Sequence, residues 1–322
     1  MKTVSKVTVL GILLLGGMAI LSGSGCGSSP SSPSNPAPTP TPQPGHGFDS
    51  SWPTYMLEGL AISGTTLYGT EGSGPIDSSN LSGGATALFA TVPGGNSYGL
   101  AVDSSGNVYA TDAVAQAYKY TSGGGTAAAT FGTTAGSSTS QLNQPFGICV
   151  DGSGNVYIAD GANSRILKLD SSFSYAATFD GSGSGTAFTY PYDVKVHGSN
   201  LYVMDFGGTD NRVVELTTSG TYVRKWGTGS TGMGNYQFKQ ALYLALDSLG
   251  NVYVGDGGND RVVLFDPSGN YLGEWGGHGT GNSQFGGPSV CSSPLGMAVD
   301  STGKIYVADS NCSSVSIKVF GP

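Results

Sequence analysis

Gly147-Ile-Cys-Val-Asp-Gly-Ser-Gly-Asn-Val-Tyr157 decides the fold, because the chain repeats this stretch with small changes. Gly99-Leu-Ala-Val-Asp-Ser-Ser-Gly-Asn-Val-Tyr109 and Gly296-Met-Ala-Val-Asp-Ser-Thr-Gly-Lys-Ile-Tyr306 are close copies, and weaker copies run over 59–68, 193–202 and 243–253. The tyrosine that ends each copy recurs at intervals of 41 to 53 residues, at 68, 109, 157, 202, 253 and 306. Six copies at this period predict an array of one supersecondary unit.

Each unit contains short apolar runs separated by glycine-rich turns. In the copy quoted first, 148–150, 155–160 and 165–169 are expected to be three strands, and 151–155 is a turn of Asp, Gly, Ser and Asn. A fourth short strand is expected to end on an aromatic residue, at Phe131, Phe179, Trp226 or Trp275. Four strands without a helical period form one propeller blade. The sequence therefore predicts an all-β fold, a six-bladed β-propeller of four-stranded blades over residues 47–322.

The ring needs a closing strand. The last copy ends with its third strand at 315–320, so the sixth blade lacks a fourth strand and would leave an unpaired edge. Residues 47–56 precede the first inner strand and belong to no other blade. We expect an N-terminal strand in this segment to pair with 315–320 and to close the propeller.

The repeated motifs closely resemble the NHL-repeat family of six-bladed β-propellers. The resemblance rests on the Gly-apolar-Ala-Val-Asp start, the Gly-Asn-Val-Tyr continuation and the Asn-x-Arg-apolar third strand. The segments Ser140-Gln-Leu-Asn-Gln-Pro145 and Ser283-Gln-Phe-Gly-Gly-Pro288 between blades match as well. The resemblance covers about residues 58–322 and implies the propeller fold. Because the family includes sensors, scaffolds and enzymes, it implies no single activity.

Residues 1–26 are typical of an export signal. Lys2 and Lys6 precede an apolar run of 15 residues, 7–21, which has the length of a signal-peptide core rather than of a membrane span. The run leads into Leu21-Ser-Gly-Ser-Gly-Cys26, which resembles a bacterial lipobox, although Gly23 stands where leucine is usual. The resemblance implies lipidation of Cys26. Cleavage within 19–25, with Cys26 left as an ordinary thiol, is the alternative.

Residues 27–46 are predicted to be a tether. The stretch 28–44 consists of Ser, Pro, Thr, Asn, Ala and Gln, a composition that stays solvated and extended. With a lipid on Cys26, the propeller would be exported and held at the bacterial cell envelope. Gly27 after the cysteine favours, by analogy with lipoproteins, the outer membrane where the cell has one. The lipid anchor would then be the only contact with the membrane.

The composition narrows the classes of partner. The 322 residues include 13 Lys+Arg and 21 Asp+Glu, for a net charge of -8, and charged residues are 11% of the chain, against a usual share of about 25%. A hydrophobic content of 38% together with 54 glycines supports a packed core and excludes wholesale disorder. So few basic residues cannot neutralise a phosphate backbone, and no nucleic-acid partner is expected.

An acidic residue follows each repeat tyrosine by three positions. Such a ring suggests a metal site, but an acid at a strand end more often caps the amides of the next turn, and Arg165, Arg212 and Arg261 are interpreted as its ion-pair partners. The three histidines lie on different predicted elements, without metal-ligand spacing. No metal, cofactor or complete catalytic set is therefore predicted. The six acids are Glu71, Asp112, Asp160, Asp205, Asp256 and Asp309.

Two cysteines are expected to pair. Cys291 lies in the loop that enters the sixth blade, and Cys312 lies in the loop after the second strand of that blade. These loops share one face of an up-and-down blade, so an exported protein should form a disulfide there, worth about 3 kcal/mol. Cys149 lies in an inner strand and is interpreted as a small buried hydrophobe.

The candidate site is the central mouth of the ring, where each inner strand begins. A mouth rimmed by Tyr and Phe with one or two carboxylates suits a neutral or weakly cationic ligand, a glycan or a polypeptide segment. The alternative is that the aromatic rings only plug the tunnel. The strand starts hold Glu58, Tyr98, Phe146, Tyr192, Leu242 and Leu295, with Asp193 beside them. We take Glu58, Tyr98, Phe146, Tyr192 and Asp193 as the candidate ligand-binding residues.

Two classes of function remain. The favoured one is a non-catalytic binding or scaffold module for a protein, peptide or glycan, tethered at the envelope. The other is a lactonase or lyase with a divalent metal at the mouth, because Glu58-Gly59 resembles the first-blade Glu-Gly of gluconolactonase-like enzymes, in which the Glu ligates a metal. Those enzymes also need an Asn and an Asp from later blades, where this chain has aromatic residues or Leu. Amidating-lyase propellers need a histidine cluster, which this chain lacks.

Overall fold

The computed structural model describes residues 48–321, apart from 55–57, 72–73, 186, 208–210, 229–231, 287–292 and 311–314. Cys26 and the tether lie outside the described residues, and so do Cys291 and Cys312. The lipid anchor and the disulfide therefore stay predictions.

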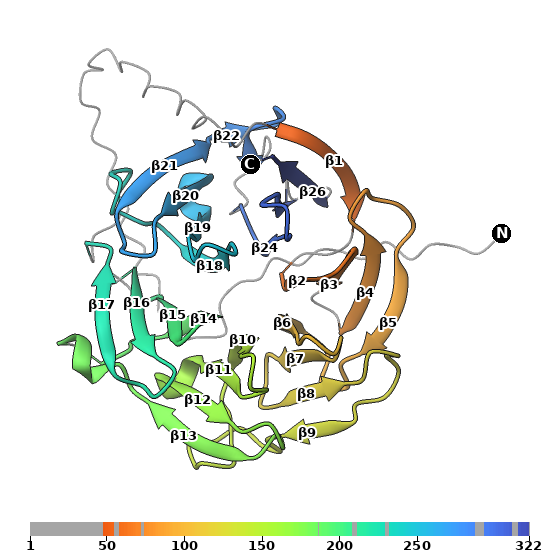
Figure 1. Ribbon diagram of the computed structural model, residues 1–322, viewed down its shortest axis with the longest axis vertical. Coiled ribbons are helices and arrows are strands. Elements are labelled where there is room, and N and C mark those ends of the chain that lie inside the picture. The colour runs from red at the N-terminus through yellow and green to blue at the C-terminus, as the bar shows by residue number, and fades with distance from the viewer. Residues whose placement is uncertain are drawn as a thin grey trace, which may run out of the picture. The chain divides into compact units, whose positions relative to one another are not determined.

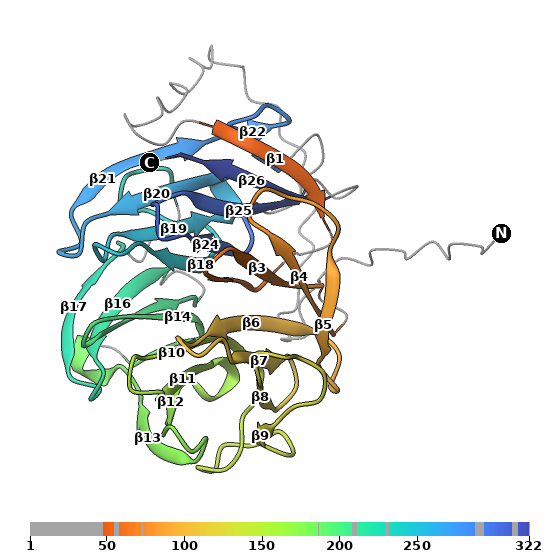
Figure 2. The same cartoon turned by 45° about the vertical axis from the view of Figure 1, so that its right-hand side comes forward.

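Six antiparallel sheets of four strands each stand around a central axis (Figure 1). The all-β, six-bladed propeller is thus confirmed. Each chain segment starts a blade at the centre and zigzags outward, so β2, β6, β10, β14, β18 and β24 surround the axis. The turned view in Figure 2 shows the twist of each blade from its inner to its outer strand.

The strands follow the blades in order. The first three blades comprise β2 (Leu60–Ser63), β3 (Thr66–Thr70), β4 (Pro75–Asn80) and β5 (Ala87–Thr91); β6 (Ser97–Val102), β7 (Val108–Asp112), β8 (Ala117–Tyr120) and β9 (Ala129–Phe131); and β10 (Pro145–Val150), β11 (Val156–Asp160), β12 (Arg165–Leu169) and β13 (Tyr175–Phe179).

The other three blades are built in the same way. They comprise β14 (Pro191–His197), β15 (Asn200–Asp205), β16 (Arg212–Thr217) and β17 (Tyr222–Trp226); β18 (Ala241–Leu246), β19 (Val252–Asp256), β20 (Arg261–Phe265) and β21 (Tyr271–Gly276); and β24 (Met297–Val299), β25 (Ile305–Ser310), β26 (Val315–Phe320) and β1 (Phe48–Thr54). A short parallel pair, β22 (His278–Gly279) and β23 (Phe285–Gly286), precedes the last blade. The helices of the described part are three 3-10 turns, η1 (Gly161–Asn163), η2 (Ser182–Ser184) and η3 (Gly257–Asn259).

The sixth blade combines both ends of the propeller. Strand β1 runs antiparallel to β26, with Phe48 opposite Phe320 and Thr54 opposite Val315, and it is the outermost strand of that sheet. In Figure 1 this first strand follows the rim next to β26. That β1 keeps the ring closed stays a prediction, which the pairing makes testable.

The repeated turn motif has a local physical cause. The Asp151 carboxylate accepts hydrogen bonds from the backbone N–H groups of Ser153 and Asn155, both at 2.9 Å, and from the hydroxyl of Tyr157 at 3.0 Å. Gly154 completes the turn at a φ of 81°, which glycine adopts without strain. The spacing from Asp to Gly to Tyr therefore encodes a self-contained hairpin turn.

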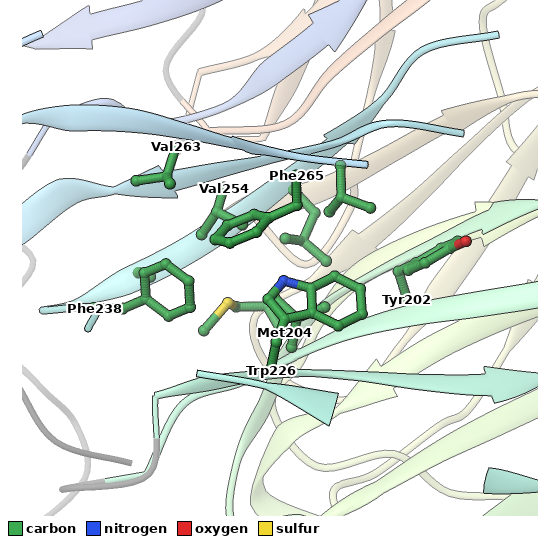
Figure 3. Close-up of a cluster of buried hydrophobic side chains, with 11 residues drawn as sticks. Tyr202, Met204, Trp226, Phe238, Val254, Val263 and Phe265 are labelled. Atoms are coloured by element: carbon green, nitrogen blue, oxygen red, sulfur yellow. The ribbon is translucent and has the colours of Figure 1, made fainter. Parts of the chain in front are cut away.

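The hydrophobic core lies between neighbouring blades. Figure 3 shows one such layer, in which Met204 and Trp226 of blade 4 face Phe238, Val254 and Phe265 of blade 5. All five residues of β11 and of β19 are buried, since a propeller strand has another sheet on each side. This explains why these runs are almost continuously apolar and not alternating.

The acids after the repeat tyrosines cap backbone N–H groups in two different ways, of which the sequence predicted one. Asp112 does cap its own turn, by accepting hydrogen bonds from the N–H groups of residues 114, 115 and 116. Asp160, Asp205 and Asp256 instead bind backbone N–H groups of the loop that enters their blade, at 2.6–2.9 Å. For Asp160 and Asp256, the following residues form a 3-10 turn with its own hydrogen bond, so the carboxylate is free to reach the other loop.

The predicted arginine partners are confirmed. Arg165, Arg212 and Arg261 pair with Asp160, Asp205 and Asp256 at 2.7, 2.8 and 2.8 Å. All six side chains are buried or nearly so, and the guanidinium groups also donate to backbone carbonyls of the loop between blades. These ion pairs hold the loops that surround the mouth.

Glycines let the inner strands touch backbone to backbone. A Cβ on Gly99 would lie 2.2 Å from the carbonyl oxygen of Phe146, and one on Gly59 would lie 2.4 Å from that of Tyr98. A backbone oxygen cannot move aside as a flexible side chain can. The first Gly of the repeat therefore allows neighbouring inner strands to approach closely around the central tunnel.

We expect Gly99→Ala to destabilise the propeller by about 2–3 kcal/mol, because overpacking a rigid site costs roughly 1–3 kcal/mol and the obstructing atom is main chain. Gly152→Ala is the matched control, since a Cβ there meets no atom within 4 Å. Urea denaturation of the two variants measures the difference. Equal unfolding midpoints would show that the inner strands are not packed as closely as described.

Within the described residues, no helix has the length and apolar character that a membrane crossing needs.

Candidate functional site

A small cavity lies where the inner strands begin, and the structure brings all five predicted mouth residues to it. The wall includes Glu58, Tyr98, Phe146, Tyr192 and Asp193. The space available to the centre of a water molecule is about 10 Å³, roughly what one water needs. The remaining wall is formed by Gly59, Leu60, Gly99, Leu100, Gly147, Lys195, Tyr243, Leu244 and Met297.

Aromatic rings from successive blades form a continuous row across the mouth. Tyr98 meets Phe146 edge to face at 5.2 Å between centroids, and Phe146 stacks on Tyr192 at 4.3 Å with 19° between the planes. Tyr192 in turn meets Tyr243 edge to face at 5.6 Å, and Tyr190 lies 5.7 Å from Phe146. Tyr98, Phe146 and Tyr192 are each partly exposed.

Glu58 is held in a tight place between neighbouring blades. The following residue, Gly59, donates its N–H to the hydroxyl of Thr70 at 2.9 Å, and a Cβ on Gly296 would lie 2.1 Å from the carbonyl oxygen of Glu58. The side chain is only 2% exposed, and its Oε2 has no hydrogen-bond partner among the described residues. Burial raises the pKa of Glu58 from 4.5 to about 8. The group is therefore mostly a neutral acid at pH 7.

Asp193 is fully engaged by the protein. One carboxylate oxygen pairs with the Lys195 ammonium at 2.9 Å and accepts the N–H of Val194 at 2.8 Å, and the other accepts the N–H of Leu244 at 2.8 Å. Burial raises the pKa of Asp193, while the charge of Lys195 opposes that shift. The carboxylate thus joins blade 4 to blade 5 and forms an internally neutral pair with Lys195.

The phenol groups of the mouth stay protonated. Burial and the nearby Glu58 raise the pKa of Tyr98 to about 12. Burial also raises the pKa values of Tyr192 and Tyr243, whose hydroxyls share a hydrogen bond. The mouth therefore offers neutral aromatic surfaces and one uncompensated carboxyl group.

Sequence reasoning missed Tyr243 and Lys195, and a signal for them existed. At the second position of the inner strands four blades have Gly, namely Gly59, Gly99, Gly147 and Gly296, while the other two have Asp193 and Tyr243. A side chain at this position, where the other blades have glycine, extends into the tunnel. Leu242 and Leu295, which the strand starts also indicated, pack against the core between blades.

The mouth does not fit a divalent metal. Such an ion takes several oxygen ligands, with carboxylates ionised. Glu58 is the only acid here that is not already bound by the protein, and the described residues contain no group of three or more His, Cys, Asp or Glu that could hold a metal. The resemblance of Glu58-Gly59 to the gluconolactonase motif does not extend to a ligand set.

Comparison with solved structures shows the same fold at low sequence identity. A gluconolactonase from Xanthomonas campestris aligns with a TM-score of 0.61 and 13% identity, over 88% of this chain and 97% of that one. The streptogramin B lyase structure gives 0.56 and 14%, over 86% and 97%. A chain of the nidogen/laminin complex gives 0.53 and 18%, over 68% and 79%.

Comparison with sequence families matches two segments. No curated protein matches the chain. The family model of the NHL repeat matches residues 142–169 and 292–320, which contain the third and sixth copies of the repeat, 147–157 and 296–306. Together with the six blades, these matches show that the chain is a six-bladed β-propeller that contains NHL repeats at residues 142–169 and 292–320.

Proposed function

We propose that this propeller is a non-catalytic binding module, exported and lipid-anchored through Cys26, that presents its mouth to a protein, peptide or glycan at the cell envelope. The observation that carries the proposal is the partly exposed aromatic row of Tyr98, Phe146 and Tyr192, which lines the same cavity as a buried carboxyl. Aromatic rings with few, well-placed polar groups are typical of ligand sites.

The surroundings of the mouth also favour binding over catalysis. The loops that lead into β6, β10, β14 and β18 cover 92–96, 132–144, 180–190 and 227–240, and Asp180 and Lys239 are their only charged residues. They are rich in Gly, Ser, Thr, Asn and Gln, which hydrogen-bond to polar ligands without a strong field. Neither a metal ligand set nor a nucleophile with an adjacent base lies at the described mouth.

The test is capture of a ligand from an envelope extract and on a glycan array. We expect Phe146→Ala to lower capture about 5- to 150-fold, because truncation of one aromatic contact residue costs on the order of 1–3 kcal/mol. Tyr175→Ala removes an aromatic ring that is 40% exposed on the outer strand β13, so it should bind normally. Cys26→Ala should in addition release the protein from the membrane fraction.

The enzyme alternative makes the opposite prediction. Stoichiometric calcium or zinc in the purified protein, with hydrolysis of a lactone or ester that is lost in Glu58→Gln, would replace the binding proposal. Equal capture by Phe146→Ala and by the parent protein would remove the mouth as its site.

A further inference from the structure

The buried Glu58 carboxyl indicates that the mouth cavity binds a hydrogen-bond donor or a cation. A polar group that is 98% buried normally has a hydrogen-bond partner, and an unsatisfied one costs about 1–3 kcal/mol. The Oε2 atom of Glu58 has none among the described residues, although it lies beside a cavity. An occupant that donates a hydrogen bond or carries positive charge would remove this cost.

None of the charged groups that line the cavity is available to pair with Glu58. From β6 it is faced by Tyr98, from β14 by Tyr192 and the Asp193–Lys195 pair, and from β18 by Tyr243. The Lys195 ammonium is held by Asp193 at 2.9 Å, so this pair is neutral as a unit. Burial alone accounts for the raised pKa of Glu58, with no cation to oppose it. A cationic ligand would have the whole carboxylate as its counter-ion.

The walls favour an ammonium group. Tyr98, Phe146, Tyr192 and Tyr243 line the cavity with aromatic rings, and a cation near ring faces gains about 0.5–2 kcal/mol when desolvated. The size of the cavity decides which cation fits. A volume of about 10 Å³ accepts one group the size of water. A primary ammonium has this size, whereas a guanidinium or a trimethylammonium is much larger.

We propose that the mouth cavity binds the ε-ammonium group of a lysine side chain presented by a protein or peptide ligand, with Glu58 as its counter-ion. Lysine combines a compact charged head with a slender methylene stem that can lie along aromatic faces. This inference rests on the proposed function and names the group that the mouth recognises. On binding, Glu58 releases its proton to solvent and the lysine ammonium takes its place.

The test uses Nα-acetyl-lysine methylamide as the probe, titrated calorimetrically into the purified protein. We expect 1:1 binding that becomes about tenfold tighter per pH unit between pH 6 and 7.5, because the proton must leave first. Titrations in two buffers of different ionisation enthalpy should show release of about 0.9 proton at pH 7. The Nε-acetylated and Nε-trimethylated forms of the probe should bind at least about tenfold more weakly.

Glu58→Gln keeps the shape of the side chain and removes its charge. We expect it to weaken probe binding about 10- to 100-fold and to abolish the pH dependence. Asp180→Asn is the matched control, since it removes an exposed charge from a loop around the mouth, and it should bind the probe normally.

Three results would overturn the inference: no binding of the lysine probe, equal binding of its acetylated form, or unchanged binding by Glu58→Gln. The last would leave a water molecule as the occupant beside Glu58. The proposed function can fail separately. A protein that captures an envelope ligand through Phe146 but ignores the lysine probe remains a binding module, with a different recognised group.

Discussion

Glu58→Gln should make the propeller more stable at pH 8 by about 4 kcal/mol, and at pH 5 by only about 1 kcal/mol. The pKa of Glu58 is raised from 4.5 to about 8 in the folded protein. As pH rises from about 4.5, the unfolded chain loses this proton while the folded one keeps it, so the free energy of unfolding falls by up to about 1.4 kcal/mol per unit. Above pH 8 both states are ionised and the loss ends. Glutamine never ionises and avoids the loss.

Urea denaturation of both proteins at pH 5, 6, 7 and 8 measures this effect. Glu71 also has a raised pKa, of about 7, but its contribution is shared by both proteins and cancels in their difference. Asp151→Asn is the contrasting variant. Although burial opposes the shift, hydrogen bonds from Ser153, Asn155 and Tyr157 lower the pKa of Asp151, so its neutralisation should lower stability at pH 7. Parallel pH profiles for Glu58→Gln and the parent protein would mean that Glu58 is ionised and has a partner.

Deletion of residues 45–56 should lower the melting temperature by on the order of 10 °C, at about 2–4 °C per kcal/mol for a domain of this size. The deletion removes β1, which pairs with β26 along its whole length. It also removes the contact between the rings of Phe48 and Phe320, at 6.1 Å, and the ion pair of Asp49 with Lys304. The exposed edge of β26 should in addition promote aggregation.

Deletion of residues 27–44 is the matched control for this experiment. It removes most of the predicted tether and leaves β1 in place, so the melting temperature should stay within about 1 °C, as expected for a solvated spacer. An unchanged melting curve for the 45–56 deletion would show that β1 does not keep the ring closed.

The blades were predictable from sequence because each one repeats the same local physics. The turn at 151–155 satisfies its own hydrogen bonds through Asp151 and Gly154, so its residues mark a hairpin wherever they recur. The mouth was predictable for a related reason. Since the inner strand of every blade starts at the same level, Glu58, Tyr98, Phe146 and Tyr192 come together once the ring is known.

Contacts between blades were not predictable in the same way. Asp193 reaches Leu244 of the next blade and Lys195 of its own. Asp160 accepts the backbone N–H of Asn143 in the entering loop as well as the side-chain amide of Asn163 in the turn that follows it. These partners depend on how far each blade is rotated from its neighbour, which the repeat alone does not determine. The sequence did contain one sign of these contacts. Asp193 and Tyr243 occupy the position at which the other four blades have glycine, so their side chains lie in the tunnel.

Resemblance to other propellers does not decide between binding and catalysis. The gluconolactonase and the streptogramin B lyase share the fold at 13% and 14% identity. Function must therefore be argued from the mouth itself. At the mouth, a row of aromatic rings and the single unpaired carboxyl of Glu58 stand where a metal site would need several oxygen ligands.

Titration of the Glu58 carboxyl is the measurement that tests the proposed lysine recognition most directly. The chain contains four glutamates, so ¹³C NMR of protein labelled at the glutamate side-chain carboxyl gives four signals, and Glu58→Gln assigns the one of interest. We expect its titration midpoint at about 8 in the protein alone, and at least about two units lower with the lysine probe bound. A midpoint near 4.5 in the protein alone would contradict the buried, unpaired carboxyl on which the proposed recognition depends.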